Sequence, residues 1–147
     1  MYRIELKHLP YSCPDLFNWC LDLPTSESAA SLLELSREGI WFQGWILTND
    51  DKPVRGYLKQ NDDYAFFDRN TARSDVIKTV LHAEPESHPQ HRCGFRQCMT
   101  IEQPEWFFGV EVDGRYIDLI SAQIVGTFKV LQGKDGWLFL DNDTNQS

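Results

Sequence analysis

The side chains best suited to bind a metal ion are three histidines within ten residues of one another, followed by a cysteine. They are His82, His88, His91 and Cys93. A tetrahedral zinc site needs four ligands that converge on one point, and spacings of six, three and two residues match no standard zinc pattern. Two prolines in the same segment restrict how it could wrap an ion. We therefore expect solvated loop histidines here, and a self-contained enzyme with a His-centred site at residues 82–91 is the alternative.

Other residues that could do chemistry lack the spacing that the chemistry needs. Calcium could be held by the oxygens of Asp62 and Asp63, or of Asp141-Asn142-Asp143, but neither run has the spacing of a calcium loop. Turn chemistry explains both runs. No serine stands in a glycine-flanked elbow beside a histidine and an aspartate. The sequence therefore predicts no catalytic residue, no metal and no cofactor for this chain.

An arginine and an aspartate at the start of a predicted helix form a candidate anion site. Arg73 could donate paired hydrogen bonds to a carboxylate or phosphate on a sugar. Alternatively, Arg73 pairs with an acidic neighbour, while Asp75 favours the positive end of the helix dipole and Ser74 is the N-cap. We favour this architectural role and keep Arg73 as a possible ligand contact.

Aromatic side chains could form a platform on which sugar rings stack. The candidates are Trp41, Trp45, Trp106, Tyr57 and Tyr64. Trp41 and Trp45 have the same strand parity, so they share one face, and we expect them in the core. Trp106 follows Pro104-Glu105 near the start of a strand, where core and surface are both possible. We take it as the first candidate for an exposed stacking residue.

The elements that position these residues are mostly strands. Alternating apolar and polar residues predict strands at 2–7, 17–23, 40–47, 54–59 and 64–67. The strand at 40–47 is apolar on both faces, which predicts a central position, and Gly44 within it marks a bulge or a close backbone approach. Turns of the Asn/Asp type separate the later strands. This pattern is typical of an antiparallel β-sandwich, immunoglobulin-like or jelly-roll-like.

Three further segments have local signals. Val76, Ile77, Val80 and Leu81 form one stripe of a short helix. Asp113-Gly114 predicts a type I′ hairpin that pairs Val112 with Arg115, Val110 with Ile117 and Phe108 with Leu119. Residues 27–38 could be a helix with Ser26 as N-cap and Gly39 as its end, or a hairpin through Glu38-Gly39. We favour the hairpin.

Composition limits the partners and the compartment. The chain has 147 residues, a net charge of −8 and 13% aromatic residues. The negative charge opposes binding to nucleic acid or to an anionic membrane surface. The sequence shows no apolar stretch of membrane-spanning length and no signal peptide, so we expect a cytoplasmic protein. We expect Cys13, Cys20, Cys93 and Cys98 to be free thiols, with a disulfide between the early and the late pair left open.

Two groups of residues resemble known families. Gly44-Trp45, Arg73-Ser74-Asp75-Val76 and Cys93-Gly94-Phe95 resemble, in their order, a β-sandwich accessory domain of bacterial glycosyltransferases and other surface-polysaccharide enzymes. That resemblance covers residues from about 15 to 125 and implies a sandwich, a polysaccharide context and no catalytic residues. In the family's motif, Gly44, Trp45, Arg73, Asp75, Gly94 and Phe95 would be structural.

The end of the chain resembles another family. The run GKDGWLFLDNDTN at residues 133–145 is similar to the opening of SGNH-hydrolase-like domains related to alginate O-acetyltransferases. The family's nucleophilic Ser and its Asp/His partners have no match in this chain. The resemblance implies a β-sandwich module at residues 1–126, and a linker with the first strand of a second domain at 127–147. We expect the protein to continue past Ser147 into that domain.

Together these patterns predict a non-catalytic accessory module of a protein that modifies a bacterial surface polysaccharide. Its partners would be its own C-terminal catalytic domain and a polysaccharide or oligosaccharide. The candidate ligand-binding residues are Trp106, Tyr57, Tyr64 and Arg73. A purely structural protein-interaction domain is a further alternative.

Overall fold

The computed structural model describes residues 2–126, 128–133 and 136–141, the last two ranges as backbone only. The chain is mainly β, with one short α-helix, as predicted. The elements are β1 (Tyr2–His8), β2 (Leu16–Leu23), β3 (Ala29–Ala30), η1 (Glu34–Glu38), β4 (Ile40–Thr48), η2 (Asn49–Asp51), β5 (Val54–Gln60), β6 (Asp63–Phe67), α1 (Ser74–Val80), β7 (Gly94–Met99), β8 (Glu105–Val112), β9 (Arg115–Val125), β10 (Phe128–Gly133) and β11 (Gly136–Asp141).

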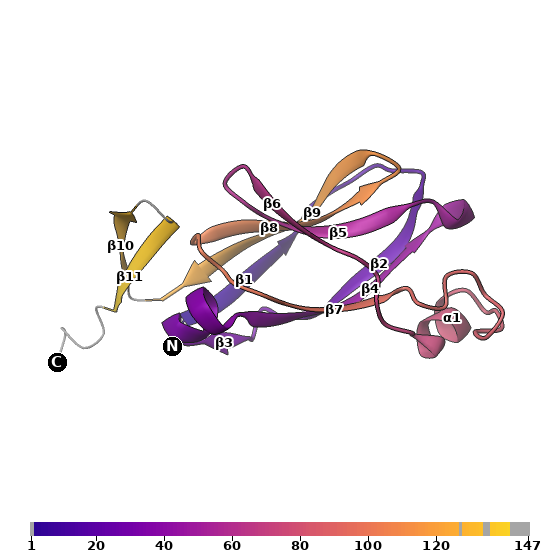
Figure 1. The fold of residues 1–147 in the computed structure, drawn as a ribbon, viewed down its shortest axis with the longest axis horizontal. Coiled ribbons are helices and arrows are strands. Elements are labelled where there is room, and N and C mark those ends of the chain that lie inside the picture. Colours follow the sequence, from indigo (N-terminus) through magenta and orange to yellow (C-terminus); the bar gives the residue numbers. More distant parts are fainter. Residues whose placement is uncertain (1, 127, 134–135, 142–147) are drawn as a thin grey trace.

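The strands β1 to β9 form two antiparallel sheets that pack as a sandwich (Figure 1). The larger has the order β3-β1-β9-β8-β5-β6, and the smaller has the order β2-β4-β7. The strand β4 is central in its sheet, as its apolar sequence predicts. β10 and β11 pair with each other as a separate two-stranded sheet. In the part of the chain that the structure describes, no helix is long and apolar enough to cross a bilayer.

The core lies between the two sheets. Phe42 of β4 meets the indole of Trp106 from β8 edge-on, with 5.4 Å between ring centroids. Phe95 of β7 lies 5.8 Å from Phe108 of β8. Because these pairs join opposite sheets, burial of their rings removes a large apolar area from water and holds the layers together.

The hairpin between β8 and β9 forms where Asp113-Gly114 predicts it. Both turn residues have positive φ, 48° for Asp113 and 85° for Gly114, which is the requirement of a type I′ turn. Val112 pairs with Arg115 and Val110 with Ile117, as predicted. Phe108 pairs with Ile120 and not with Leu119, because a register shift follows Phe108. The bulge adds a residue that the simple alternation cannot foresee.

The preferred hairpin at residues 27–38 is wrong. A two-residue strand, β3, pairs with β1, and the following residues coil into η1. The backbone N–H of Glu34 donates to Ser31 Oγ, and the N–H of Ser31 donates to Glu34 Oε1. This is a capping box, a Ser-x-x-Glu signal that starts a helix. Ser26 is therefore not the cap, while Gly39, at φ 86°, does end the helical segment.

The predicted helix is α1, but its predicted cap is wrong. Its N-cap position is Arg73, with no capping side-chain hydrogen bond, so Ser74 lies inside the helix. The helix covers the outer face of the smaller sheet at one end (Figure 1). There Val76 and Ile77 are buried against Leu47 of β4 and Cys93. This second apolar cluster fixes the helix to the sheet.

Gly44 combines the two features that its position in the strand predicts. It pairs with Phe95 of β7 and with Leu21 of β2, beside a register shift in β2. A Cβ atom at this position would collide with the carbonyl oxygen of Cys20. Only glycine therefore allows the backbones of β2 and β4 to approach each other so closely.

Candidate functional site

Aromatic side chains gather on the outer face of the larger sheet, opposite the core. Along β5, Leu58 faces inward and belongs to the core, so its neighbours Tyr57 and Lys59 face outward. On the adjacent edge strand β6, Phe67 belongs to the core and Phe66 faces outward. Because successive side chains of a strand point to opposite faces of the sheet, one set of rings lies on the outer face.

Four of these rings touch one another and form what we call the aromatic patch: Tyr57, Tyr64, Phe66 and Tyr116. Tyr64 and Phe66 are stacked with an interplanar angle of 10° and centroids 5.7 Å apart. Tyr116 reaches over from β9 and meets Tyr64 edge-on at 5.2 Å. Tyr57 is fully buried beneath them, whereas Tyr64 is 39% exposed and Tyr116 51% exposed. The patch therefore has a buried base and two accessible tyrosine rings.

A glycine makes room for the base of the patch. Gly109 of β8 pairs with Tyr57 of β5 in the sheet register. A Cβ atom on Gly109 would collide with the Tyr57 ring and with the carbonyl oxygen of Ile117. Glycine in the interior of a strand often marks such a close approach. Gly109 therefore lets the Tyr57 ring lie down on the sheet and support the rings above it.

Two ion pairs border the aromatic patch. Lys59 Nζ lies 2.7 Å from Asp118 Oδ2, and the Tyr57 hydroxyl donates to the other oxygen of Asp118. Arg55 donates from Nε and Nη2 to the two oxygens of Glu111, at 3.0 and 3.3 Å. The Arg55 guanidinium also lies 3.5 Å from the centroid of the Phe66 ring. The border thus carries two positive and two negative groups and no net charge.

These contacts set the protonation of the tyrosine at the base. Burial, and then the hydrogen bond to Asp118, raise the pKa of Tyr57 well above its ordinary value near 10. The Arg55 hydrogen bond lowers the pKa of Glu111. Tyr57 therefore remains a neutral donor and Glu111 an ionised acceptor at physiological pH.

The expected exposure of Trp106 is wrong. Its side chain is 0% exposed and packs in the core, because it shares strand parity with Phe108 and Val110 on the inner face of β8. Its indole Nε1 has no hydrogen-bond partner among the described residues. Trp106 therefore cannot stack on a ligand in the folded protein.

The expected burial of Trp41 is also wrong. Trp41 and Trp45 share a face of β4 as predicted, but it is the outer face of the smaller sheet, because Phe42 and Ile46 occupy the inner one. Trp41 is 46% exposed beneath the Arg96 guanidinium, which lies 4.0 Å from its ring centroid. Trp45 is half-buried against the cluster below α1.

Arg73 does pair with an acidic neighbour. It donates two hydrogen bonds to the Asp75 carboxylate, at 3.0 and 2.9 Å, and lies 3.3 Å from Asp22 of β2. The hydrogen bonds from Arg73 lower the pKa of Asp75. Arg73 thus links the start of α1 to the edge of the smaller sheet, and three of its five side-chain N–H donors are engaged.

The six motif residues from the family resemblance lie together where the start of α1 meets the smaller sheet. Gly44 pairs with Phe95, and Trp45 pairs with Gly94, across β4 and β7. A Cβ atom on Gly94 would come within 2.5 Å of the Arg73 side chain and 2.9 Å of the carbonyl oxygen of Thr71. Gly94 therefore allows the loop that leads into α1 to approach the smaller sheet.

Among the described residues, the histidine loop forms no metal site and the cysteines form no disulfide. His88 Nδ1 accepts the backbone N–H of Gln90 at 3.0 Å, while His82 is exposed. Within the described part of the chain, no group of three His, Cys, Asp or Glu side chains could hold a metal ion. Two acidic runs are predicted as turns, Asp62-Asp63 and Asp141-Asn142-Asp143. Of the second run, Asn142 and Asp143 lie outside the described residues. All four cysteines are described and are free thiols, so the open disulfide alternative is not formed.

Sequence reasoning missed part of the patch. Tyr57 and Tyr64 were candidates, but Phe66, Tyr116 and the ion pairs with Asp118 and Glu111 were not. The β5–β6 hairpin carries a signal for Phe66, since its register places Phe66 opposite Tyr57. No local signal brings in Tyr116, which arrives from a strand two positions away in the sheet.

The comparisons with known proteins leave the site to be interpreted from its own geometry. No protein-family model matches the chain, and neither a curated protein nor a solved structure matches it.

Proposed function

We propose that this chain is a non-catalytic β-sandwich module that binds carbohydrate through the aromatic patch. The observation that carries the proposal is the pair of accessible rings, Tyr64 and Tyr116, held on the outer face of the larger sheet. The face of an aromatic ring is electron-rich and attracts the C–H side of a sugar ring. The two rings meet at an interplanar angle of 79°, so the face of one can stack on a sugar residue while the edge of the other borders it.

The patch is organised before any ligand arrives. Tyr64 and Tyr116 contact each other and also contact the buried ring of Tyr57, at 5.0 and 6.0 Å between centroids. Tyrosine has few rotatable bonds, so ordering it on binding costs little conformational entropy. Rings that are already fixed by their neighbours reduce this cost further.

The polar border supplies hydrogen-bonding groups next to the rings. Lys59 and Arg55 are donors, while Asp118 and Glu111 are acceptors, and a sugar hydroxyl can act as both. Because the charges are paired with one another, the border favours a neutral glycan over a strongly anionic one.

The ion pairs of the border also argue for binding without catalysis. Glycoside hydrolysis commonly uses two carboxyl groups, one of them an acid with a raised pKa. Glu111 has a lowered pKa, and Asp118 already accepts hydrogen bonds from both Tyr57 and Lys59. Neither group is suited to deliver a proton to a leaving group.

The wider context follows from the family resemblances. We propose that the module belongs to a protein that modifies a bacterial surface polysaccharide, in which it recognises the glycan for, or docks against, an SGNH-hydrolase-like domain beyond Ser147. The strand β11 carries the Trp137–Leu140 run on which that resemblance depends.

The proposal is tested by isothermal titration of the protein with neutral oligosaccharides such as cello-, manno- and chito-oligosaccharides. We expect millimolar binding to at least one series, with a loss of roughly tenfold in affinity for Tyr116→Ala or Tyr64→Ala, which corresponds to about 1.4 kcal/mol per ring. Tyr11→Ala, which removes another exposed tyrosine from a loop outside the patch, should bind like the wild type. Absence of binding, or binding that survives both patch variants, would refute the proposal.

A further inference from the structure

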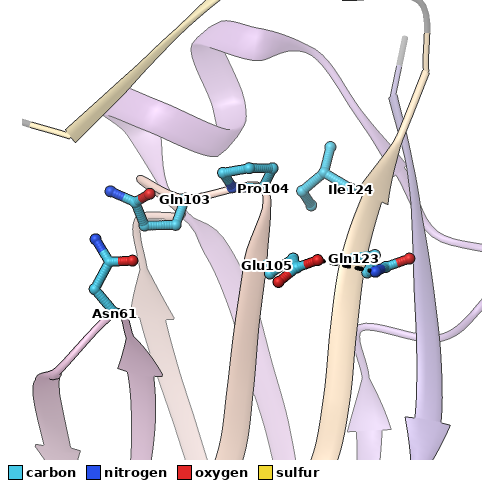
Figure 2. Close-up of a pocket in the computed structure, with 6 residues that line it drawn as sticks. All are labelled: Asn61, Gln103, Pro104, Glu105, Gln123 and Ile124. Carbon is cyan, nitrogen blue, oxygen red and sulfur yellow. Dashed lines mark hydrogen bonds between the residues drawn. The ribbon is translucent and has the colours of Figure 1, made fainter. Parts of the chain in front are cut away.

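A polar cleft opens on the larger sheet, at the end where β8 begins (Figure 2). It encloses about 360 Å³ between the β5–β6 turn, the start of β8 and the end of β9, and it is lined by Asn61, Gln103, Pro104, Glu105, Gln123 and Ile124. Glu105 pairs with Gln123, and two residues further along β8, on the same face, Phe107 pairs with Lys59 of the patch border. The cleft therefore adjoins the aromatic patch on the same sheet.

The lining of the cleft is rich in amides. The side chains of Asn61 and Gln103 make no hydrogen bond within the described part of the chain, and Figure 2 shows them on one side of the cleft. On the other side, Gln123 Nε2 donates to Glu105 Oε1 at 3.1 Å, which leaves the other oxygens of this pair free. Pro104 adds apolar surface between the two sides, and Ile124 adds apolar surface beside Glu105 and Gln123. Free amides and apolar surface in one cleft suit a ligand with hydroxyl groups and C–H faces.

The wall of the cleft is rigid. Gln60 Oε1 accepts the backbone N–H groups of Glu102 and Gln103, and Gln60 Nε2 donates to the carbonyl of Thr100 at 3.1 Å. Within the same loop, Ile101 is fully buried. The N–H of Ile124 also donates to the carbonyl of Pro104 at 2.8 Å. One glutamine thus fixes the loop that presents Gln103.

A second, larger groove continues from the cleft. It encloses about 960 Å³ along β1 and β9, between side chains such as Arg3, Lys7 and Ser121, and it shares Gln123 with the cleft. Arg3 and Glu5 on its floor are paired with each other at 2.8 Å. The patch, the cleft and the groove therefore follow one another across the larger sheet.

We propose that the cleft is a second carbohydrate subsite, which binds the hydroxyl groups of a neutral sugar residue while the aromatic patch stacks on another residue of the same chain. This inference depends on the proposed function and adds to it the class of ligand. An amide offers a donor and an acceptor, as does each sugar hydroxyl, so the two match in pairs. The ligand is therefore an oligosaccharide and not a monosaccharide.

The charge of the cleft selects against acidic sugars. Among the described residues that line it, Glu105 is the only charged one, and none of them is a Lys or Arg that could receive a carboxylate or a phosphate. The chain as a whole carries a net charge of −8. A uronic acid residue placed beside Glu105 would meet like charge at close range, which costs binding free energy.

The experiment compares two cleft variants with a patch variant on neutral oligosaccharides of increasing length. Gln103→Ala preserves the backbone hydrogen bond to Gln60, and Gln123→Ala removes only the exposed pair with Glu105, so both should fold. Each should lose roughly tenfold in affinity for long oligosaccharides and little for disaccharides. Gln97→Ala, an exposed glutamine on β7, is the control and should bind normally. Thermal unfolding of each variant checks that the fold is unchanged.

The outcomes separate the two proposals. If long oligosaccharides bind, Tyr116→Ala weakens them and both cleft variants bind like the wild type, the second subsite is refuted while the proposed function stands. If no neutral oligosaccharide binds, the proposed function itself is refuted. Oligogalacturonates serve as the acidic probe, and tighter binding of these than of the neutral series would overturn the assignment of a neutral ligand.

Discussion

Replacing Trp106 with phenylalanine should leave the protein almost as stable as the wild type. Trp106 is fully buried against Phe42, and its indole Nε1 has no partner among the described residues. A buried donor without a partner has lost its hydrogen bond to water and gained nothing in return. Phenylalanine keeps a ring in the same place and removes that donor.

The magnitude follows from two opposing contributions. Phenylalanine is smaller than tryptophan by roughly 40 Å³, so a cavity at about 24 cal/mol per Å³ costs about 1 kcal/mol, and the lost burial of the removed atoms costs about 1 kcal/mol more. Removing an unpaired buried N–H returns about 1–3 kcal/mol. The net change in the free energy of unfolding therefore lies within about 1 kcal/mol of zero. Trp106→Ala, which removes the ring altogether, should cost about 3–5 kcal/mol.

Urea unfolding followed by circular dichroism measures these differences without depending on tryptophan fluorescence. Trp45→Phe is the matched control, because Trp45 is half-buried on the outer face of the smaller sheet. If Trp106→Phe loses more than about 2 kcal/mol, the indole N–H has a partner in solution and the reasoning fails. The same result for Trp106→Ala and Trp106→Phe would show that the ring itself contributes little.

Three further measurements test contacts elsewhere. The pKa of Tyr57 is raised in the folded state, so its contribution to stability should be complete below about pH 10 and lost at higher pH, as the unfolded tyrosine ionises; Tyr57→Phe should flatten this alkaline decline in urea titrations. The pKa of Asp75 is lowered by Arg73, so its contribution should be present above the ordinary value of 3.8 and lost as the pH falls through the folded value; Asp75→Asn should be slightly less stable than the wild type at neutral pH, by less than about 1 kcal/mol, and equal to it in strong acid. Cys98 is exposed, whereas burial raises the pKa of Cys20 to about 11, so a thiol reagent should label Cys98 first, and a rapid phase that persists in Cys98→Ser would contradict this.

Local signals in the sequence were enough for most of the strands. The alternation in β1, the apolar run of β4 and the Asp113-Gly114 turn each depend on neighbouring residues, and each predicted the correct element. The helical segment after β3 is the alternative that the sequence analysis does not favour, although Ser31 and Glu34 carry its signal. There the capping box was overlooked in favour of a turn at Gly39.

The orientation of the faces could not be predicted from the same signals. Alternation shows that Trp41 and Trp45 share a face, but Phe42 and Ile46 make the opposite face equally apolar. Which set faces inward depends on the second sheet, whose position is not encoded in that strand. The prediction of the aromatic patch is incomplete for a similar reason, since Tyr116 lies on β9, two strands away from β5, and the β8–β9 hairpin does not encode which strand lies beside it.

The pairing of the first strand with the last strand of the larger sheet has a consequence for how the chain folds during synthesis. β1 pairs with β9 from Arg3 opposite Val125 to His8 opposite Ile120, and β9 in turn joins β8. During synthesis, β1 cannot pair with β9, and Ile4 cannot be fully buried, until almost the whole sandwich has left the ribosome. Contacts so distant in sequence make folding slow. The nascent chain therefore has an open strand edge for most of its synthesis, which is the interval in which a chaperone would protect it.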